Sequence, residues 1–330
     1  MHGALLVDKP SGPTSHDVVA VARRSLKTPA IGHTGTLDPL ATGLLVLLIG
    51  HATRLSRFLV TDEKEYLADI RLGQSTPTYD AQGIEAGSAR REVQITPEQI
   101  RAVLPDFLGT FPQLPPAFSA KKVAGVRAYK KARKQEDVVL KPVEVTVREL
   151  ELLDRGPQDP GTPDRGTQDR GTLDPGTQDR GTDDPGPRDP GLIRLRITCS
   201  SGFYVRSLAH DIGQLLGCGA HLEALRRTRA GQFDLADAMT LDALQAAGPA
   251  AADRLIGLNS LLPGMPGVTL TEEGKRRALN GNTLAPGHLD GPVSPAGPGQ
   301  NSRVLDASGT LISVAEMRGD GLLHPLLVLR

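Results

Sequence analysis

The segment IGHTGTLDPLATGLLVLLIG, residues 31 to 50, places a polar loop directly before a dense apolar run. The run LLVLLIG has no polar residue before its glycine, which predicts a strand buried on both faces. In the loop, Gly32, Gly35 and Gly43 indicate unusual backbone angles or a close approach of neighbouring chain. Asp38 precedes a proline there, which is an ordinary helix-capping or turn signal. The pattern alone therefore leaves open whether Asp38 is a capping residue or a catalytic one.

Length and composition restrict the class of protein. A chain of 330 residues is long enough for about two domains with their own cores. No apolar run approaches the roughly 18 residues of a membrane helix, and the N-terminus has no secretion signal. The two cysteines, Cys199 and Cys218, lack metal-ligand spacing, which argues against a disulfide framework or zinc site and predicts a cytoplasmic protein.

The neutral net charge conceals an uneven distribution. Residues 154–191 hold nine aspartates and five arginines, so 33 basic and 29 acidic residues are left elsewhere. The basic residues form three clusters: Lys121, Lys122, Arg127, Lys130, Lys131, Arg133 and Lys134; Arg226, Arg227 and Arg229; and Lys275, Arg276 and Arg277. Such clusters are often solvated faces, but three of them favour a polyanionic partner.

Residues 154–191 are a five-residue repeat of the form Asp-(Arg/Pro)-Gly-(Thr/Pro)-x. With so few apolar residues it cannot offset the entropy of ordering, so we expect a disordered insertion. A calcium-binding repeat is the alternative, although the spacing does not fit one. The flanking segments 143–153 and 192–198 alternate like half-buried strands, so the repeat is interpreted as an enlarged hairpin turn.

Other segments predict a mixed α and β protein. Thr96 and Gln99 form a capping-box pattern before a helical stripe that Pro105 would kink. Ser15 is a plausible cap for a helix in SHDVVAVARRSL, and a further helix is expected in SLAHDIGQLLG, residues 207–217. After residues 244–267 come the short strand-like runs GVTLT, SRVLDAS, GTLISVAEM and LLHPLLVLR, which suggest a small barrel-like β module.

The chemistry candidates are few. No glycine-rich phosphate loop occurs, and no second carboxylate lies near Asp38 in sequence to make a glycosidase pair. In CSSGFYVRSLAHDIG, Tyr204 and Arg206 stand two apart at the end of a predicted strand, so both should face the same way. A buried Arg206 would pair with a carboxylate and keep it ionised. The alternative is a core tyrosine beside a surface arginine.

Six blocks together resemble the bacterial tRNA pseudouridine synthase B family: LLVDKPSGPTSHDVV, GHTGTLDPLATGLLVLLIGHATR, KEYLADIRLGQSTPTYDAQG, PPAFSAKKVAGVRAYKKAR, SSGFYVRSLAHDIG and GCGAHLEALRRTRAG. They span most of residues 3 to 232 in the family's order. The resemblance implies an α+β pseudouridine synthase fold, a mixed and mainly antiparallel sheet flanked by helices and loops. It also implies a small barrel-like PUA domain at the C-terminus, a looser match.

The family's roles carry over onto matching positions. Asp38 matches the catalytic aspartate, and His33 matches the histidine that helps to extrude the target uridine. Tyr66 matches the tyrosine packed against the flipped base, and Tyr204 a second active-site aromatic. Arg206 matches the arginine that pairs with the aspartate. Leu225 is the weaker match to a pocket wall.

For RNA binding, the resemblance implies a thumb-like segment at about 114–142. The RNA contacts expected on charge are Lys121, Lys122, Arg127, Lys130, Lys131, Lys134, Arg226 and Arg227. The expected organisation is a catalytic domain over 1–262, containing the repeat at 154–191, and a PUA-like domain over 265–330.

The implied reaction converts uridine to pseudouridine at position 55 in the T-loop of tRNA, by base flipping and without a cofactor or metal. Whether Asp38 attacks C1′, adds to C6 or removes the 2′ proton is left open. The alternatives are a catalytically weak tRNA folding chaperone and a synthase acting on another RNA. A monomer that binds tRNA and no membrane is expected.

Overall fold

The computed structural model describes residues 1–60, 63–84, 92–118, 122–123, 126–127, 140–153, 191–291 and 297–329. The chain divides into two compact units. The first comprises Met1–Tyr66, Thr198–Phe203 and Leu225–Arg330, and the second Leu67–Ile197 and Tyr204–Ala224. Nearly all of the predicted repeat and most of the predicted thumb lie outside the described residues, so both expectations stay predictions, as do the domain boundaries near residues 262 and 265.

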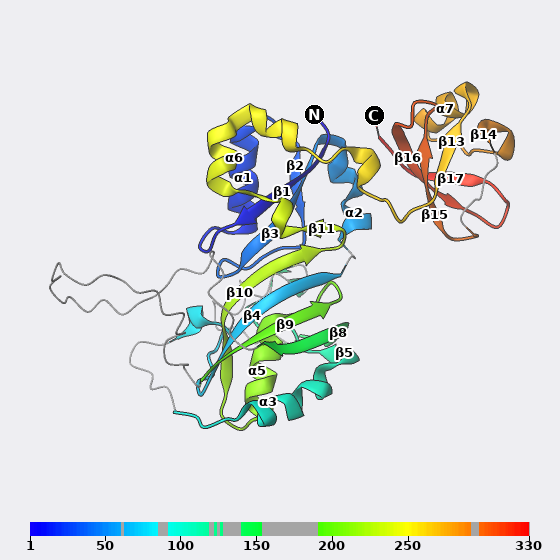
Figure 1. Cartoon of the computed structure of the whole chain (residues 1–330). Coiled ribbons are helices and arrows are strands. Elements are labelled where there is room, and N and C mark those ends of the chain that lie inside the picture. The colour runs from blue at the N-terminus through cyan, green and yellow to red at the C-terminus, as the bar shows by residue number, and fades with distance from the viewer. Residues whose placement is uncertain are drawn as a thin grey trace, which may run out of the picture. The chain divides into compact units, whose positions relative to one another are not determined.

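The larger sheet has ten strands (Figure 1). Its main order is β12 (Met239–Thr240), β1 (Gly3–Lys9), β3 (Thr42–Ile49), β10 (Ala220–Ala230), β4 (Lys64–Leu72), β9 (Leu192–Cys199), β8 (Val143–Leu153) and β5 (Gly109–Gln113). β2 (Ile31–Thr34) pairs with β3, and β11 (Phe233–Asp234) with β10. The β1–β3, β2–β3, β5–β8 and β10–β11 pairs are antiparallel, whereas β1–β12 and β3–β10 are parallel. The predicted mixed, mainly antiparallel sheet is confirmed.

The core of the first unit is centred on β3, as its unbroken apolar run predicts. Leu44, Val46 and Leu48 join one apolar cluster, and the alternate residues Leu45 and Leu47 are 0% exposed. Both faces of the strand are therefore buried. The helices α1 (Ser15–Ser25) and α6 (Leu241–Ala247) lie side by side and contact this part of the sheet (Figure 1).

The start of α1 differs from the prediction. Its cap is Thr14, whose hydroxyl accepts a hydrogen bond from Asp17 N at 3.1 Å, while the Asp17 carboxylate accepts one from Thr14 N at 2.8 Å. Thr14 and Asp17 thus form a reciprocal capping box, in which two otherwise unpaired backbone amides are satisfied. Ser15 is the first helical residue instead, and its buried hydroxyl is available for another contact.

In the second unit, the predicted capping box of Thr96 and Gln99 opens α3 (Pro97–Val103). Pro105 cannot donate a backbone hydrogen bond, and the α-helix gives way there to a 3-10 turn over Leu104–Phe107. The predicted strands 143–153 and 192–198 are observed as the neighbours β8 and β9, as a hairpin requires. The helix α5 (Val205–Leu215) begins two residues earlier than the predicted 207–217.

The C-terminal strands form a separate sheet, in the order β14 (Leu289–Asp290), β13 (Gly267–Leu270), β15 (Asn301–Leu305), β16 (Leu311–Met317) and β17 (Leu323–Val328). It packs around its own apolar cluster with α7 (Glu272–Leu279). Leu284 also forms an isolated antiparallel bridge with Leu323 of β17. No ladder closes the sheet within the part of the chain that is described, so it is an open sheet and not the expected barrel.

The remaining elements are short. They are α2 (Ser56–Leu59), the paired strands β6 (Lys122–Val123) and β7 (Val126–Arg127), and the 3-10 helices η1 (Gly50–Leu55), η2 (Ala81–Gly83), η3 (Leu104–Phe107), η4 (Leu235–Asp237), η5 (Gly248–Arg254), η6 (Leu258–Ser260) and η7 (Pro286–His288). Within the described ranges, no helix combines the length and the apolar character needed to cross a membrane.

Candidate active site

Asp38 lies in the loop between β2 and β3, in the first unit. Ala41 N donates to Asp38 O at 3.1 Å, and Pro39 is the second residue of the resulting turn. No helix follows Asp38, so the turn interpretation of the Asp-Pro pair is correct and the helix-capping interpretation is wrong. His33, on β2, stands opposite Leu47 of β3 in the antiparallel register. The hairpin therefore carries both predicted residues on a short connection to the buried strand.

Lys9, at the end of β1, fixes the C-terminal side of this turn. Its side chain is 0% exposed, and Nζ donates to Ala41 O at 2.6 Å, to Pro10 O at 2.9 Å and to Pro39 O at 3.3 Å. Charge-assisted hydrogen bonds of this kind are roughly twice as strong as neutral ones. Lys9 therefore fixes the backbone that follows Asp38.

Ser15, in the first turn of α1, fixes the other side. Its hydroxyl accepts a hydrogen bond from Leu37 N at 2.9 Å and donates one to Leu37 O at 3.1 Å. Ser15 is 1% exposed and Leu37 is 3% exposed, so water does not replace these bonds readily. Ser11, which is exposed, adds a weaker contact at 3.3 Å to Leu40 O. The backbone on both sides of Asp38 is therefore held by the N-terminal segment.

Arg227, on β10, holds the start and end of the hairpin loop. Its Nε donates to Leu44 O at 2.7 Å and its Nη2 to Gly35 O at 3.0 Å. Gly43 allows this approach, since a Cβ there would lie 2.3 Å from the Arg227 carbonyl oxygen. The positive charge of Arg227 also acts on Tyr66 and opposes the rise in the pKa of its hydroxyl that burial causes. Arg227 is 1% exposed and its guanidinium is bound to the hairpin, so its predicted contact with RNA gains no support from its position and stays a prediction.

Two aromatic side chains of this unit are biased toward their neutral forms. Burial lowers the pKa of His33, and the charges of Arg227 and His16 lower it further. Burial raises the pKa of Tyr66, against the opposing charge of Arg227. At neutral pH both rings are therefore uncharged and suited to contact another ring. The buried Nδ1 of His33 has no hydrogen-bond partner among the described residues.

The electrostatic setting of Asp38 is positive. Burial lowers the pKa of Lys9 to about 8, with the negative charge of Asp38 acting against this shift and the positive charge of Arg227 adding to it. Two buried cations thus lie within electrostatic range of the Asp38 loop, and they favour a negative charge there. Where the structure describes side chains, no three His, Cys, Asp or Glu residues gather as a metal ion would require. The predicted independence from cofactors stays a prediction.

Leu225 and Arg226 precede Arg227 on β10. Leu225 is 9% exposed, and its carbonyl oxygen accepts a bond from Thr42 Oγ1 at 3.3 Å. Arg226 makes a two-point ion pair with Asp8, at 2.9 and 3.2 Å. Its side chain keeps 17% of its surface exposed, so the predicted RNA contact is compatible with its position.

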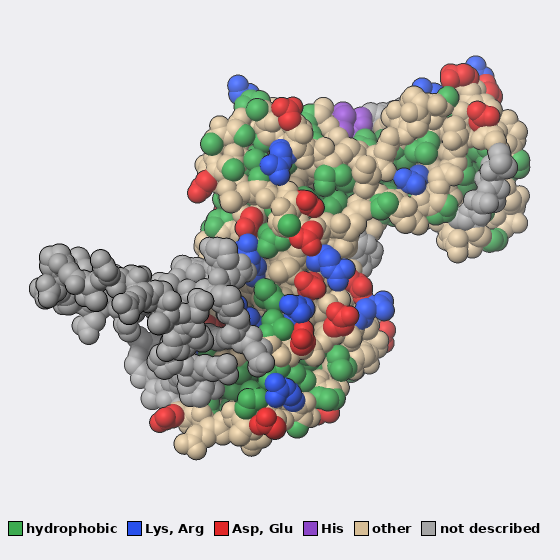
Figure 2. Space-filling view, in the orientation of Figure 1, with side chains coloured by type: hydrophobic (Ala, Val, Ile, Leu, Met, Phe, Trp, Pro, Cys, Tyr) green, Lys and Arg blue, Asp and Glu red, His purple; other side chains and the backbone are tan. Residues whose placement is uncertain are grey.

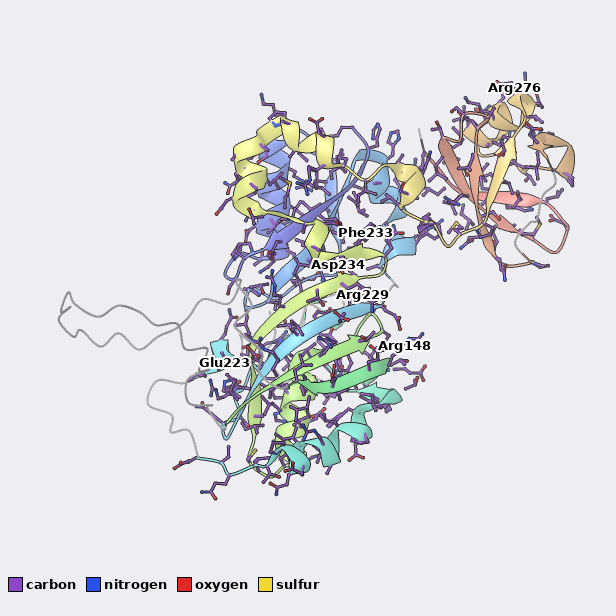
Figure 3. The ribbon with its side chains drawn as sticks, viewed as in Figure 1. Arg148, Glu223, Arg229, Phe233, Asp234 and Arg276 are labelled. Carbon is purple, nitrogen blue, oxygen red and sulfur yellow. The ribbon has the colours of Figure 1, made fainter. Side chains whose placement is uncertain are left out.

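The third arginine of that cluster, Arg229, stands opposite Asp234 of β11 in the strand register (Figure 3). On the C-terminal sheet's helix α7, Lys275 pairs with Asp306 at 2.8 Å, and Arg276 pairs with Glu273. Ion pairs therefore involve Arg226 of one basic cluster and Lys275 and Arg276 of the other.

In the second unit, Tyr204 and Arg206 do not lie on a strand as predicted. β9 ends at Cys199, Tyr204 is the N-cap residue of α5, and Arg206 lies in that helix's first turn. The argument that both side chains share one face of a strand was therefore wrong. Gln113, which is 3% exposed, fixes the Tyr204 backbone by accepting from its N at 2.8 Å and donating to its O at 3.0 Å.

Arg206 is 6% exposed, which rules out the surface-charge alternative. Its Nη1 lies 3.4 Å from Asp80 Oδ2 and donates to Thr78 O at 3.2 Å, while Nη2 donates to Phe118 O at 3.1 Å. Removing one partner of such a buried pair leaves an uncompensated charge, which is strongly destabilising. The predicted pairing of Arg206 with Asp38 joins residues of different units and stays a prediction.

The sequence analysis did not single out Asp80. It is 4% exposed and accepts hydrogen bonds from Thr78 Oγ1 at 2.6 Å and from Gln82 N at 3.1 Å. The pattern TPTYDAQG reads as a turn with a capping aspartate, and Asp80 does cap η2. Its burial against Arg206 depends on α5, more than 120 residues away, as the separation of 128 between Thr78 and Arg206 shows. No local signal could have revealed it.

Most of the predicted RNA-binding lysines lie outside the residues that the structure describes. Lys121, Lys130, Lys131 and Lys134 fall outside the described residues. The backbone of Lys122 pairs with that of Arg127 in the β6–β7 hairpin. These contacts remain predictions.

Figure 2 shows basic and acidic side chains interspersed over the strands of the second unit. Arg194 pairs with Asp69 at 2.6 Å, Arg196 with Glu151 at 2.9 Å and Arg71 with Glu223 at 3.8 Å. These pairs largely neutralise one another, whereas a phosphate-binding surface requires net positive charge. Each of these three arginines is therefore balanced by an acidic partner.

Comparison with known proteins identifies two family matches. Residues 23–161 match the TruB family pseudouridylate synthase N-terminal domain, and residues 206–258 match the tRNA pseudouridylate synthase B C-terminal domain. The tRNA pseudouridine synthase B of Solibacter usitatus is 41% identical over 334 residues, covering 100% of both chains. That of Opitutus terrae is 43% identical over 269 residues, covering 81% of this chain and 97% of its own.

Among solved structures, the archaeal box H/ACA sRNP Nop10–Cbf5 complex contains a chain with a TM-score of 0.67 and 21% identity. The match covers 99% of this chain and 86% of that one. At this identity the likeness concerns the fold alone.

Proposed function

Because this chain belongs to the TruB family of pseudouridylate synthases, it is a tRNA pseudouridine synthase, and we propose that Asp38 carries the isomerisation of uridine 55 in the T-loop. The observation that supports this role is the fixation of the Asp38 loop. Lys9, Ser15 and Arg227 all bind the hairpin through its main-chain atoms. A reacting group must be held within about 0.5 Å of its productive position, and such a support achieves this.

The reaction is an isomerisation in which atoms balance without a redox step. The N1–C1′ bond breaks, the uracil turns, and a C5–C1′ bond forms. The C5 hydrogen leaves as a proton, and N1 gains one. One ionised carboxylate is sufficient as nucleophile or base in a site that excludes water. The charge of Asp38 acts on Lys9 and opposes the lowering of the Lys9 pKa by burial.

The uridine must leave the RNA stack first, which costs a few kcal/mol. We assign His33 to this step, because a neutral imidazole on the hairpin can fill the gap without the cost of desolvating a charge. Tyr66 would pack against the extruded uracil as a neutral ring, because burial raises the pKa of its hydroxyl.

Arg206, Tyr204 and Leu225 are proposed as supporting residues of the site. For Arg206 the proposal is that it orients the Asp38 carboxylate, so Arg206→Ala should lower turnover far more than tRNA affinity. Normal turnover by that variant would contradict the role.

Contacts with tRNA are proposed for the thumb-like segment 114–142 and the PUA-like segment 265–330, in a cytoplasmic monomer. Substituting Lys130, Lys131 and Lys134 should make the loss of tRNA binding with salt less steep, because fewer counterions are released.

Tritium release from tRNA transcripts labelled at uracil C5 tests the assignment directly. Wild type should release tritium, and mapping should locate the pseudouridine at position 55. Asp38→Asn should bind the transcript with unchanged affinity and release none. Release by Asp38→Asn at the wild-type rate would refute the role of Asp38. Tight binding with no release by wild type would favour an RNA folding chaperone.

A further inference from the structure

Tyr79, in the turn before Asp80, has an unusual backbone. Its φ is 61°, and among the described non-glycine residues only Lys27 shares a positive value. The left-handed conformation costs about 1–2 kcal/mol for a residue with a side chain. Such a residue persists where its surroundings determine it, and it often marks a functional site.

Two kinds of contact hold Tyr79 in this conformation. Its N donates to Thr76 O at 3.1 Å, and its O accepts from Leu222 N at 3.0 Å. Its ring stacks on His210 of α5, with 3.9 Å between ring centroids and 11° between the planes. Aromatic pairs of this kind contribute about 0.5–1.5 kcal/mol beyond buried area, a gain comparable to the backbone strain.

His210 and Arg206 lie four residues apart on α5, so they share one face of the helix. The residues on either side of Tyr79 both contact Arg206, through Thr78 O at 3.2 Å and Asp80 Oδ2 at 3.4 Å. The turn therefore meets α5 at two points, a guanidinium and an imidazole. Both contacts to Arg206 are near the long end of the hydrogen-bond range, so a small displacement of the turn would break them.

We propose that Tyr79 and His210 are positioning residues, whose stacked rings hold the 78–80 turn against Arg206 and so fix its guanidinium for the reaction. The inference rests on the proposed function of Arg206. Neither ring needs to touch the uridine. Arg206 has many rotamers, and without the stack its guanidinium would spend less time in the productive one.

Single-turnover rates on T-loop transcripts, measured across enzyme concentrations, test this by separating the maximal rate from the half-saturating concentration. Tyr79→Ala and His210→Ala should each lower the maximal rate about tenfold or more, with half-saturation within twofold of wild type. Tyr79→Phe keeps the ring and should stay within twofold of the wild-type rate. Tyr79→Gly relieves the strain but removes the ring, so it should be as slow as Tyr79→Ala. Leu215→Ala, on an exposed face of the same helix, is the matched control and should change neither value.

The effect must also depend on Arg206. In an Arg206→Ala background, Tyr79→Ala should slow the residual rate less than twofold, because the group to be positioned is gone. If the rate losses of Tyr79→Ala and Arg206→Ala multiplied fully in the double variant, the inference would be overturned. It would also be overturned if Tyr79→Ala raised the half-saturating concentration at an unchanged maximal rate, because that would indicate a contact with RNA. Urea unfolding confirms that each variant is folded. If Arg206→Ala were as fast as wild type, the proposed role of Arg206 would fail; if only Tyr79→Ala were as fast, this inference alone would fail.

Discussion

Replacing Ser15 with alanine tests whether the N-terminal segment holds the catalytic loop. The Ser15 hydroxyl makes both an accepted and a donated hydrogen bond with the Leu37 backbone, at 2.9 and 3.1 Å, one residue before Asp38. The alanine variant would keep the helix start, because Thr14 is the capping residue. Only the two bonds to the loop would be lost.

The size of the effect follows from burial. A buried amide that loses its only acceptor costs about 1–3 kcal/mol, and the second bond contributes about 0.5–1.5 kcal/mol. Alanine's higher helix propensity offsets a few tenths of a kcal/mol at most. We therefore expect Ser15→Ala to lower the free energy of unfolding by about 2 kcal/mol. Urea unfolding at equal m-value measures this change.

Catalysis should respond as well, because the loop loses its anchor on one side of Asp38. Tritium release at saturating transcript should slow about tenfold, a barrier increase of about 1.4 kcal/mol, with unchanged transcript affinity. Ser11→Ala is the control. Ser11 is exposed and lies 3.3 Å from Leu40 O, so its loss should cost less than about 0.5 kcal/mol and leave the rate unchanged.

Two results would refute the reasoning. A stability loss for Ser15→Ala no larger than that of Ser11→Ala would mean that water or the loop itself replaces the bonds. A full stability loss with wild-type turnover would mean that Asp38 is held independently of Leu37.

Three further outcomes are expected. Burial lowers the pKa of Lys9 from 10.5 to about 8, so between these pH values the unfolded chain binds more protons than the folded one. The free energy of unfolding should therefore rise with pH across this window in wild type but not in Lys9→Met, and urea titrations at several pH values measure it. Gly43→Ala should destabilise by about 3 kcal/mol in urea, because its φ is 95° and its Cβ would strike the Arg227 carbonyl. Hydrogen bonds from Lys275 hold the pKa of Asp306 well below 3.8; Asp306→Asn should therefore melt earlier than wild type at pH 7, with the difference shrinking as pH falls below about 4.

The sequence was informative wherever structure depends on local pattern. The unbroken apolar run in residues 44–49 predicted a strand buried on both faces, which is β3. Thr96 and Gln99 predicted the start of α3, because their side chains bond each other's backbone amides there. The sequence was ambiguous at FYVRSL, where aromatic and β-branched residues favour a strand while the structure begins a helix at Val205. There, packing outweighs local propensity.

The site was predictable in its residues more than in its contacts. The resemblance pointed to Asp38, but the neighbours Arg226 and Arg227 looked alike in sequence. On a strand, adjacent side chains face opposite sides, so one pairs with Asp8 at the surface while the other is buried. Which one is buried depends on how β10 pairs with β3, and that pairing joins segments over 180 residues apart.

The supports of the Asp38 loop have a consequence for how this protein tolerates substitution. Lys9, Ser15 and Arg227 bind the loop through its main-chain carbonyl and amide groups, and among the residue types only proline lacks the amide hydrogen. The exposed side chain of Thr36 takes no part in these main-chain bonds. Exposed positions such as Thr36 can change in sequence while the backbone around Asp38 is held, whereas Gly35, Gly43 and buried Leu37 are constrained.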